Sequence, residues 1–201
     1  MRGGFTLIEV LIVIFISLLI MAGTIFNTSD FRLNSAVQAA VNEIVRITAE
    51  ARNLTSTGKE LTNGLFPNYG VMFDISNPRA VVLFADCNLD DAPPFGVVDD
   101  KDDFTFQASG TSCDGGNGLV QSVNFTNDSR VGIRAVRSIE ETTQTGSRAH
   151  IVFIRPEPST WVIGVNNSAQ SYGRVEVDVG DAAGTYLKTI RFWTSGHVEI
   201  K

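Results

Sequence analysis

The N-terminal segment, residues 3–29, reads GGFTLIEVLIVIFISLLIMAGTIFNTS, and the organisation of the whole chain follows from it. Residues 10–29 carry no charge, and most of them are Val, Leu, Ile, Phe or Met. About 20 helical residues at ~1.5 Å each span the ~30 Å hydrocarbon core of a bilayer. Arg2 precedes the apolar run, so the positive-inside rule keeps the N-terminus cytoplasmic and exports the rest. The segment therefore predicts one membrane-spanning helix.

Glu9 is the exception within this segment, because it places a carboxylate among apolar side chains. A carboxylate near the bilayer centre costs about 2.5–3.5 kcal/mol on insertion scales, so such a residue usually has a partner or a function. The alternative is that Glu9 lies at the level of the lipid headgroups, where it is solvated and incidental. The residues alone leave both interpretations open.

The motif Gly3-Gly4-Phe5-Thr6-Leu7-Ile8-Glu9 resembles the N-terminal signature of type IV pilins and type II secretion pseudopilins. In that family a short basic leader ends in glycine, a prepilin peptidase cuts after it, and the new N-terminal residue is N-methylated. The resemblance implies a leader at residues 1–4, cleavage between Gly4 and Phe5, a methylated amine on Phe5 and an assembly role for Glu9. Its implied partners are other pilin or pseudopilin subunits, the prepilin peptidase, the inner-membrane assembly platform and the lipid bilayer.

The helix is expected to continue beyond its transmembrane half, residues 5–29. Over residues 30–57, apolar side chains recur at three- and four-residue steps, with polar ones between them. This amphipathic pattern suits packing against a globular head. Thr55-Ser56-Thr57-Gly58 supplies the end of the helix, with Gly58 as a left-handed cap.

The remainder, residues 58–201, is expected to form an extracytoplasmic, β-rich globular head. Several runs alternate polar and apolar residues, as half-buried strands do, and turn residues separate them. Strands after one long helix indicate an α+β, pilin-like fold with a mostly antiparallel sheet. The expected strands are residues 71–75, 80–85, 120–125, 150–154, 161–165, 174–179, 187–193 and 197–200.

Within the family, the head most resembles the minor pseudopilin H and fimbrial T group. This resemblance implies a minor filament subunit. It is carried by short motifs: Glu50-Ala51-Arg52, Tyr69-Gly70-Val71, Leu83-Phe84-Ala85-Asp86, Ile190-Arg191-Phe192 and Ser195-Gly196-His197-Val198.

Cys87 and Cys113 are the only two cysteines of the chain. In an exported head they are expected to form a disulfide, whose loop of roughly 25 residues would contribute about 3–4 kcal/mol in the chain-entropy model. Two reduced thiols, one of them buried, are the alternative.

An acidic cluster lies beside and between these cysteines. Asp86, Asn88 and Asp90 place oxygen ligands at alternate residues, which suits Ca²⁺ with its 6–8 oxygen ligands. The glycine and the twelfth-position glutamate of an EF-hand loop are absent. A calcium site and a solvated acidic loop both fit the pattern.

The net charge of −6, from 16 Lys+Arg and 22 Asp+Glu, makes nucleic acid an unlikely main partner. Arg130, Arg134 and Arg137 could still form a local basic strip. No G-x-S-x-G, H-E-x-x-H or P-loop motif occurs, so we do not expect an enzyme. His150 and His197 lie in strand-like segments, where we expect them to face outward or to be hydrogen-bonded.

These observations favour a structural subunit, minor by the resemblance, of a type IV pilus-like or type II secretion filament. The precursor is expected in the bacterial inner membrane, with its N-terminus in the cytoplasm and its head outside. A major pilin is the nearest alternative. An adhesin or DNA-uptake pilin, which binds a ligand through its head, and a plain single-pass membrane protein are the others.

Overall fold

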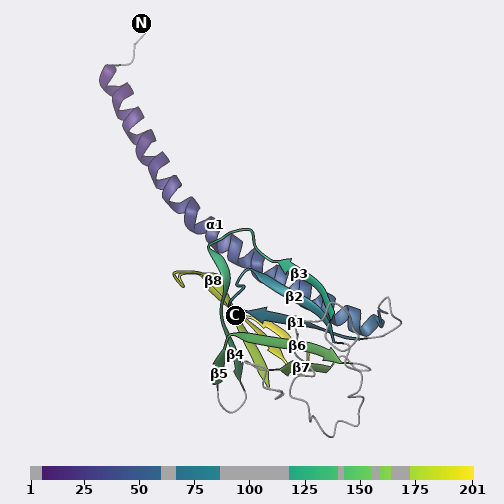
Figure 1. Ribbon diagram of the computed structural model, residues 1–201. Coiled ribbons are helices and arrows are strands. Elements are labelled where there is room, and N and C mark those ends of the chain that lie inside the picture. Colours follow the sequence, from purple (N-terminus) through teal and green to yellow (C-terminus); the bar gives the residue numbers. More distant parts are fainter. Residues whose placement is uncertain (1–5, 60–66, 87–117, 140–142, 155–158, 164–172) are drawn as a thin grey trace. The chain divides into compact units, whose positions relative to one another are not determined.

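Figure 1 shows the computed structural model, which describes residues 6–59, 67–86, 118–139, 143–154, 159–163 and 173–201. Cys87, Cys113, Asn88 and Asp90 lie outside these residues, as does the side chain of Asp86, so the disulfide and the calcium site stay predictions. The described elements are α1 (Leu7–Thr57), β1 (Asn68–Asp74), β2 (Ala80–Asp86), β3 (Gly118–Asn124), β4 (Val131–Ile139), β5 (Thr143–Gly146), β6 (Arg148–Ile154), β7 (Ser159–Ile163), β8 (Arg174–Asp181), β9 (Leu187–Trp193) and β10 (Val198–Ile200).

The chain divides into two compact units, Met1–Ser35 and Ala36–Lys201. The described part of the first unit is helical and belongs to α1. The second unit contains the rest of α1 and two five-stranded sheets, in the orders β3-β2-β1-β6-β7 and β10-β9-β8-β4-β5. Every described strand pair is antiparallel. The α+β class and the antiparallel pairing are therefore confirmed.

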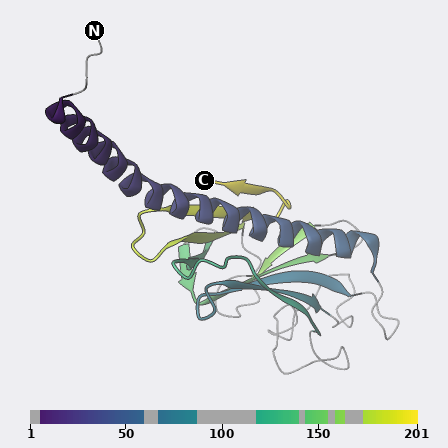
Figure 2. The ribbon, with the colours of Figure 1, turned by 90° about the horizontal axis from the view of Figure 1, so that it is seen from above.

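The helical part of the second unit packs through one apolar stripe, and Figure 2 shows this part of α1 lying along the strands. The stripe follows the three- and four-residue steps of a helix face, so one side of the helix can be buried completely. Phe73 of β1 stacks on Phe192 of β9 with ring centroids 5.5 Å apart, which joins the cores of the two sheets. The fully buried stripe consists of Val37, Ala40, Val41, Ile44, Ile47 and Ala51.

The end of α1 has the geometry expected from the sequence. Gly58 has a φ of 62°, the left-handed conformation that glycine adopts without steric cost. Lys59 N donates to Leu54 O at 3.2 Å and Gly58 N donates to Thr55 O at 3.3 Å, the paired bonds of a Schellman motif. Tyr69 N, at the start of β1, donates to the Thr55 hydroxyl at 3.0 Å. The cap therefore both ends the helix and fixes the entry into the first sheet.

Most expected strands are present with shifted ends, but β4 and β5 were not expected. In β4 the pairing with β8 shifts between Ile133 and Ala135, and this irregularity interrupts the alternation that marks a strand in a sequence. β5 reads TQTG and has no apolar residue to mark it. β4 is held by β8, far along the chain, and β5 is an edge strand that pairs with β4, so local patterns reveal neither strand.

His150 is where the structure contradicts the sequence-based expectation. Its side chain is 1% exposed, and neither ring nitrogen has a hydrogen-bond partner. The ring meets Phe84 edge-on at 6.1 Å, beside the ion pair of Arg148 with Asp74. Burial, and secondarily the charge of Arg148, lowers the pKa of His150 to about 4. The expectation of an outward or hydrogen-bonded His150 is therefore wrong, because strand alternation does not tell which side of a two-sided sheet is covered.

The buried His150 predicts a loss of stability in acid. Its pKa of about 4 in the fold lies below the ordinary histidine value of 6.5, so the fold favours the neutral ring. The contribution of His150 to the free energy of unfolding is therefore fully present above about pH 6.5 and is lost as the pH falls toward 4. Between pH 7 and pH 5 the free energy of unfolding should fall by about 2 kcal/mol. We expect His150→Leu to remove this part of the pH dependence, measured by chemical denaturation at both pH values. An unchanged pH dependence in the variant would contradict the assignment.

Candidate functional site

The start of α1 is closed by Thr6 and Glu9. The helix begins at Leu7, so Thr6 is its N-cap residue. Thr6 N donates to Glu9 Oε2 at 2.8 Å, and the Thr6 hydroxyl donates to the same oxygen at 2.9 Å. Glu9 N in turn donates to Thr6 Oγ1 at 3.4 Å. This reciprocal arrangement is a capping box, so the Glu9 carboxylate is hydrogen-bonded within its own chain.

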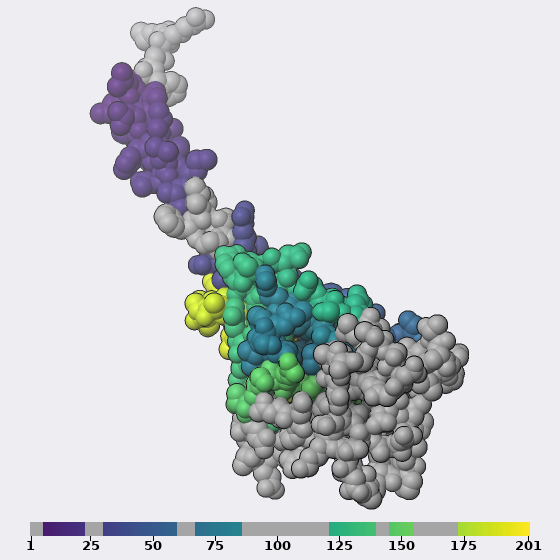
Figure 3. Space-filling model, in the orientation of Figure 1, coloured from purple at the N-terminus to yellow at the C-terminus, as the bar shows by residue number. Residues whose placement is uncertain are grey.

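Large apolar side chains surround this polar pair and continue along the helix. From residue 7 to residue 21 all of them are exposed by half or more, and Leu7 reaches 83%. Figure 3 shows them in purple on the surface. An apolar surface of this extent marks a segment that another molecule covers. Among the residues that the structure describes, no helix combines the length and the apolarity needed to cross a bilayer.

The comparison with protein families concerns this same segment. Residues 1–25 match the prokaryotic N-terminal methylation motif. The match supports the resemblance to the type IV pilin-like family and to substrates of the prepilin peptidase. It ends before the head, so it does not distinguish among members of that family. No curated protein and no solved structure matches the chain.

Of the residues predicted for the site, Glu9 is described, and it contacts Thr6, which the sequence analysis did not single out. Gly4 and Phe5, the predicted cleavage and methylation residues, lie outside the described residues, although the motif match includes them. For the calcium prediction, only the backbone of Asp86, at the end of β2, is described. Within the described part of the chain, no cluster of three His, Cys, Asp or Glu side chains could hold a metal ion.

The three arginines considered as a basic strip are engaged within the protein. Arg130 pairs with Asp128 at 2.7 Å and holds the pKa of that carboxyl near 2. Arg137 pairs with Asp178 at 2.6 Å, and this hydrogen-bonded partner raises its pKa. Arg134 donates to the carbonyl oxygens of Arg130 and Gly180, at 2.6 and 3.0 Å. Two of the three charges of the strip, those of Arg130 and Arg137, are therefore paired with carboxylates.

Arg137 belongs to a charged network that crosses the second sheet. Glu176 of β8 is only 6% exposed. Its carboxylate forms ion pairs with Arg191 at 2.8 Å, Arg174 at 3.2 Å and Arg137 at 3.5 Å. Arg174 also lies over the Trp193 ring, 4.9 Å from its centroid. A carboxylate this buried needs partners, and three strands supply them. Sequence reasoning missed the network because its members are dispersed over some 60 residues of chain.

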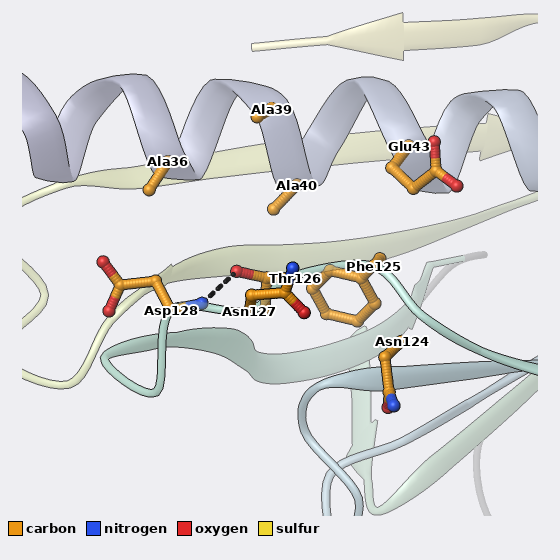
Figure 4. Close-up of a pocket in the computed structure, with 9 residues that line it drawn as sticks. All are labelled: Ala36, Ala39, Ala40, Glu43, Asn124, Phe125, Thr126, Asn127 and Asp128. Carbon is orange, nitrogen blue, oxygen red and sulfur yellow. Dashed lines mark hydrogen bonds between the residues drawn. The ribbon is translucent and has the colours of Figure 1, made fainter.

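A groove of about 430 Å³ lies between α1 and the connection from β3 to β4 (Figure 4). On the helix side, most of the lining side chains are alanines and are therefore small. The opposite side is formed by a mostly polar loop. In that loop Asp128 N donates to the Thr126 hydroxyl at 3.2 Å. Glu43 on the helix already pairs with Arg46 at 2.7 Å. The groove is lined by Ala36, Ala39, Ala40, Glu43, Asn124, Phe125, Thr126, Asn127 and Asp128.

The paired arginines predict that the protein does not bind DNA at physiological salt. A gel-shift titration with the full-length protein in detergent should show no complex at about 0.15 M salt, because non-specific binding needs free cations. Asp128→Asn releases Arg130 and should make any low-salt binding about one unit steeper in its log–log salt dependence. A shift by the wild type at physiological salt that Arg137→Gln abolishes would overturn this assignment.

Proposed function

We propose that this chain is a structural subunit of a type IV pilus-like or type II secretion filament. It is made as a precursor, cleaved by the prepilin peptidase after Gly4, methylated on Phe5 and assembled through its N-terminal helix. The observation that carries the proposal is the match of residues 1–25 to the N-terminal methylation motif. The exposed apolar side chains of residues 7–21 support it, since assembly would cover them.

Before assembly, residues 5–29 hold the subunit in the inner membrane, with residues 30–201 outside the cytoplasm. Arg2 and the uncharged run of residues 10–29 support this topology. The capped Glu9 supports it as well, because a carboxylate that already accepts two hydrogen bonds is less costly to bring near lipid. The inner-membrane assembly platform is then the site where the subunit leaves the bilayer.

Within this function, a minor subunit is the finer assignment, and only the resemblance of the head to the pseudopilin H and fimbrial T group favours it. Its abundance in sheared filaments separates a minor from a major subunit. An adhesin or DNA-uptake role is less well supported, since the arginines that would serve it are paired. The disulfide of Cys87 with Cys113 and a calcium site at Asp86, Asn88 and Asp90 stay predictions for the head.

Processing is expected to remove residues 1–4. The motif places the cut between Gly4 and Phe5, so intact-mass measurement should show loss of Met1 through Gly4 and gain of one methyl group. The formal side-chain charge then becomes −7, because Arg2 leaves and −6 − 1 = −7. Cells without prepilin peptidase provide the control. If the protein from cells with an active peptidase had the mass of the uncleaved precursor, the proposal would be contradicted.

Glu9→Ala is expected to be inserted and cleaved after Gly4 but to fail to enter filaments. Between staggered subunits the Phe5 amine of one chain could meet the Glu9 carboxylate of another inside the apolar bundle. An unpaired charge there costs several kcal/mol, so loss of the carboxylate leaves the amine without a partner.

The measurement is the fraction of subunit recovered in sheared filaments, or secretion of the cargo if the system is a secretion system. Glu50→Ala is the matched control, since Glu50 is also a carboxylate of α1 but pairs with Arg46 at 3.0 Å. It should assemble normally. Assembly of Glu9→Leu at wild-type efficiency would refute the role of Glu9.

A further inference from the structure

We propose that Thr6 is a positioning residue for Glu9, which holds the Glu9 carboxylate on its own chain until a neighbouring subunit replaces it. The inference rests on the proposed function and adds a step to it. Glu9 then has two successive partners: Thr6 in the free subunit, and the amine of another subunit in the filament.

The geometry of the first turn supports the first partnership. Both hydrogen bonds from Thr6, through its N and its hydroxyl, end on Glu9 Oε2. Glu9 N returns a bond to Thr6 Oγ1, so the two side chains fix each other. Among the described residues, the hydrogen bonds that Glu9 accepts through its carboxylate both end on Oε2, and Oε1 is the oxygen that an incoming donor would approach.

No other side chain of the described apolar segment can take over this task. Leu7 and Ile8, which lie between the two residues, have no polar side-chain atoms. Ser17 carries the other hydroxyl of residues 6–21, and it donates to Val13 O at 2.8 Å, two turns away from Glu9. Among the side chains of residues 6–21, Thr6 is therefore the one that can satisfy the carboxylate.

The exchange follows from the strengths of the two kinds of bond. The Thr6 hydroxyl is a neutral donor to an ionised carboxylate, whereas the amine created by cleavage also carries a charge of opposite sign, so its bond adds the Coulomb attraction between two charges. Thr6 can thus hold Glu9 in the free subunit without preventing the later ion pair. Loss of the hydroxyl should leave the carboxylate with only the hydrogen bond from the N of residue 6 near lipid, where an ionised side chain is costly.

The test is the lifetime of the full-length chain in membranes of cells that lack the assembly platform, followed by pulse-chase. Thr6→Val keeps the shape of the side chain but removes the hydroxyl, and we expect its lifetime to fall about fivefold, the equilibrium effect of losing a typical N-cap. Thr6→Ser keeps the hydroxyl and should match the wild type. Glu9→Gln keeps a capping-box acceptor, so its lifetime should also match, although the variant should not assemble.

A double-mutant cycle separates positioning from a merely structural cap. If Thr6 acts through the carboxylate, Thr6→Val should have a smaller effect in a Glu9→Ala background, where Thr6 Oγ1 keeps only the bond from the N of residue 9. A Thr6→Val chain as long-lived as the wild type, or one shortened equally in both backgrounds, overturns the inference. Failure of the proposed function would be seen separately, as a wild-type chain that keeps residues 1–4. The lifetimes of the Thr6 variants and of the wild type could still be compared in that case.

Discussion

The buried stripe of α1, from Val37 to Ala51, is the contact on which the second unit depends. A five-stranded sheet has two faces, and an apolar face must be covered by another layer. The helix lies over strands of the head, and Phe73 against Phe192 joins the sheets beneath it. Because Tyr69 N, at the start of β1, donates to the Thr55 hydroxyl at 3.0 Å, the helix also helps to fix where the first sheet starts.

The sequence predicted those strands in which apolar and polar residues alternate regularly from end to end. β9 was expected at residues 187–193, as found, because Ile190 and Phe192 alternate with polar residues. β4 was missed because its irregularity at Ile133 breaks that alternation. The burial of His150 and the pairing of Arg137 with Asp178 depend on residues distant in the chain. At the candidate site, the motif singled out Glu9, but its bond to Thr6 required the structure, although the T-x-x-E spacing of a capping box was present in the sequence.

Charged side chains of the second sheet form ion pairs with one another, within and between its strands. Glu176 and Asp178 of β8 neutralise arginines from the neighbouring strands, and Thr189 adds a hydroxyl to Asp178 at 2.7 Å. This arrangement stabilises strand pairing across the sheet but leaves little net charge for a ligand. In the described part of the second sheet, Arg137, Arg174 and Arg191 are therefore paired with carboxylates of β8.

The exposed helix of residues 7–21 has a consequence for how subunits align. Apolar attraction is not directional, and its strength follows the area covered. Two such helices could slide past each other by one turn, about 5.4 Å, with almost unchanged apolar contact. Area thus determines how strongly the helices adhere, but it cannot select one stagger among several. Only a feature that occurs once per helix can do so, and the Thr6–Glu9 pair, at the extreme end of the apolar run, is such a mark.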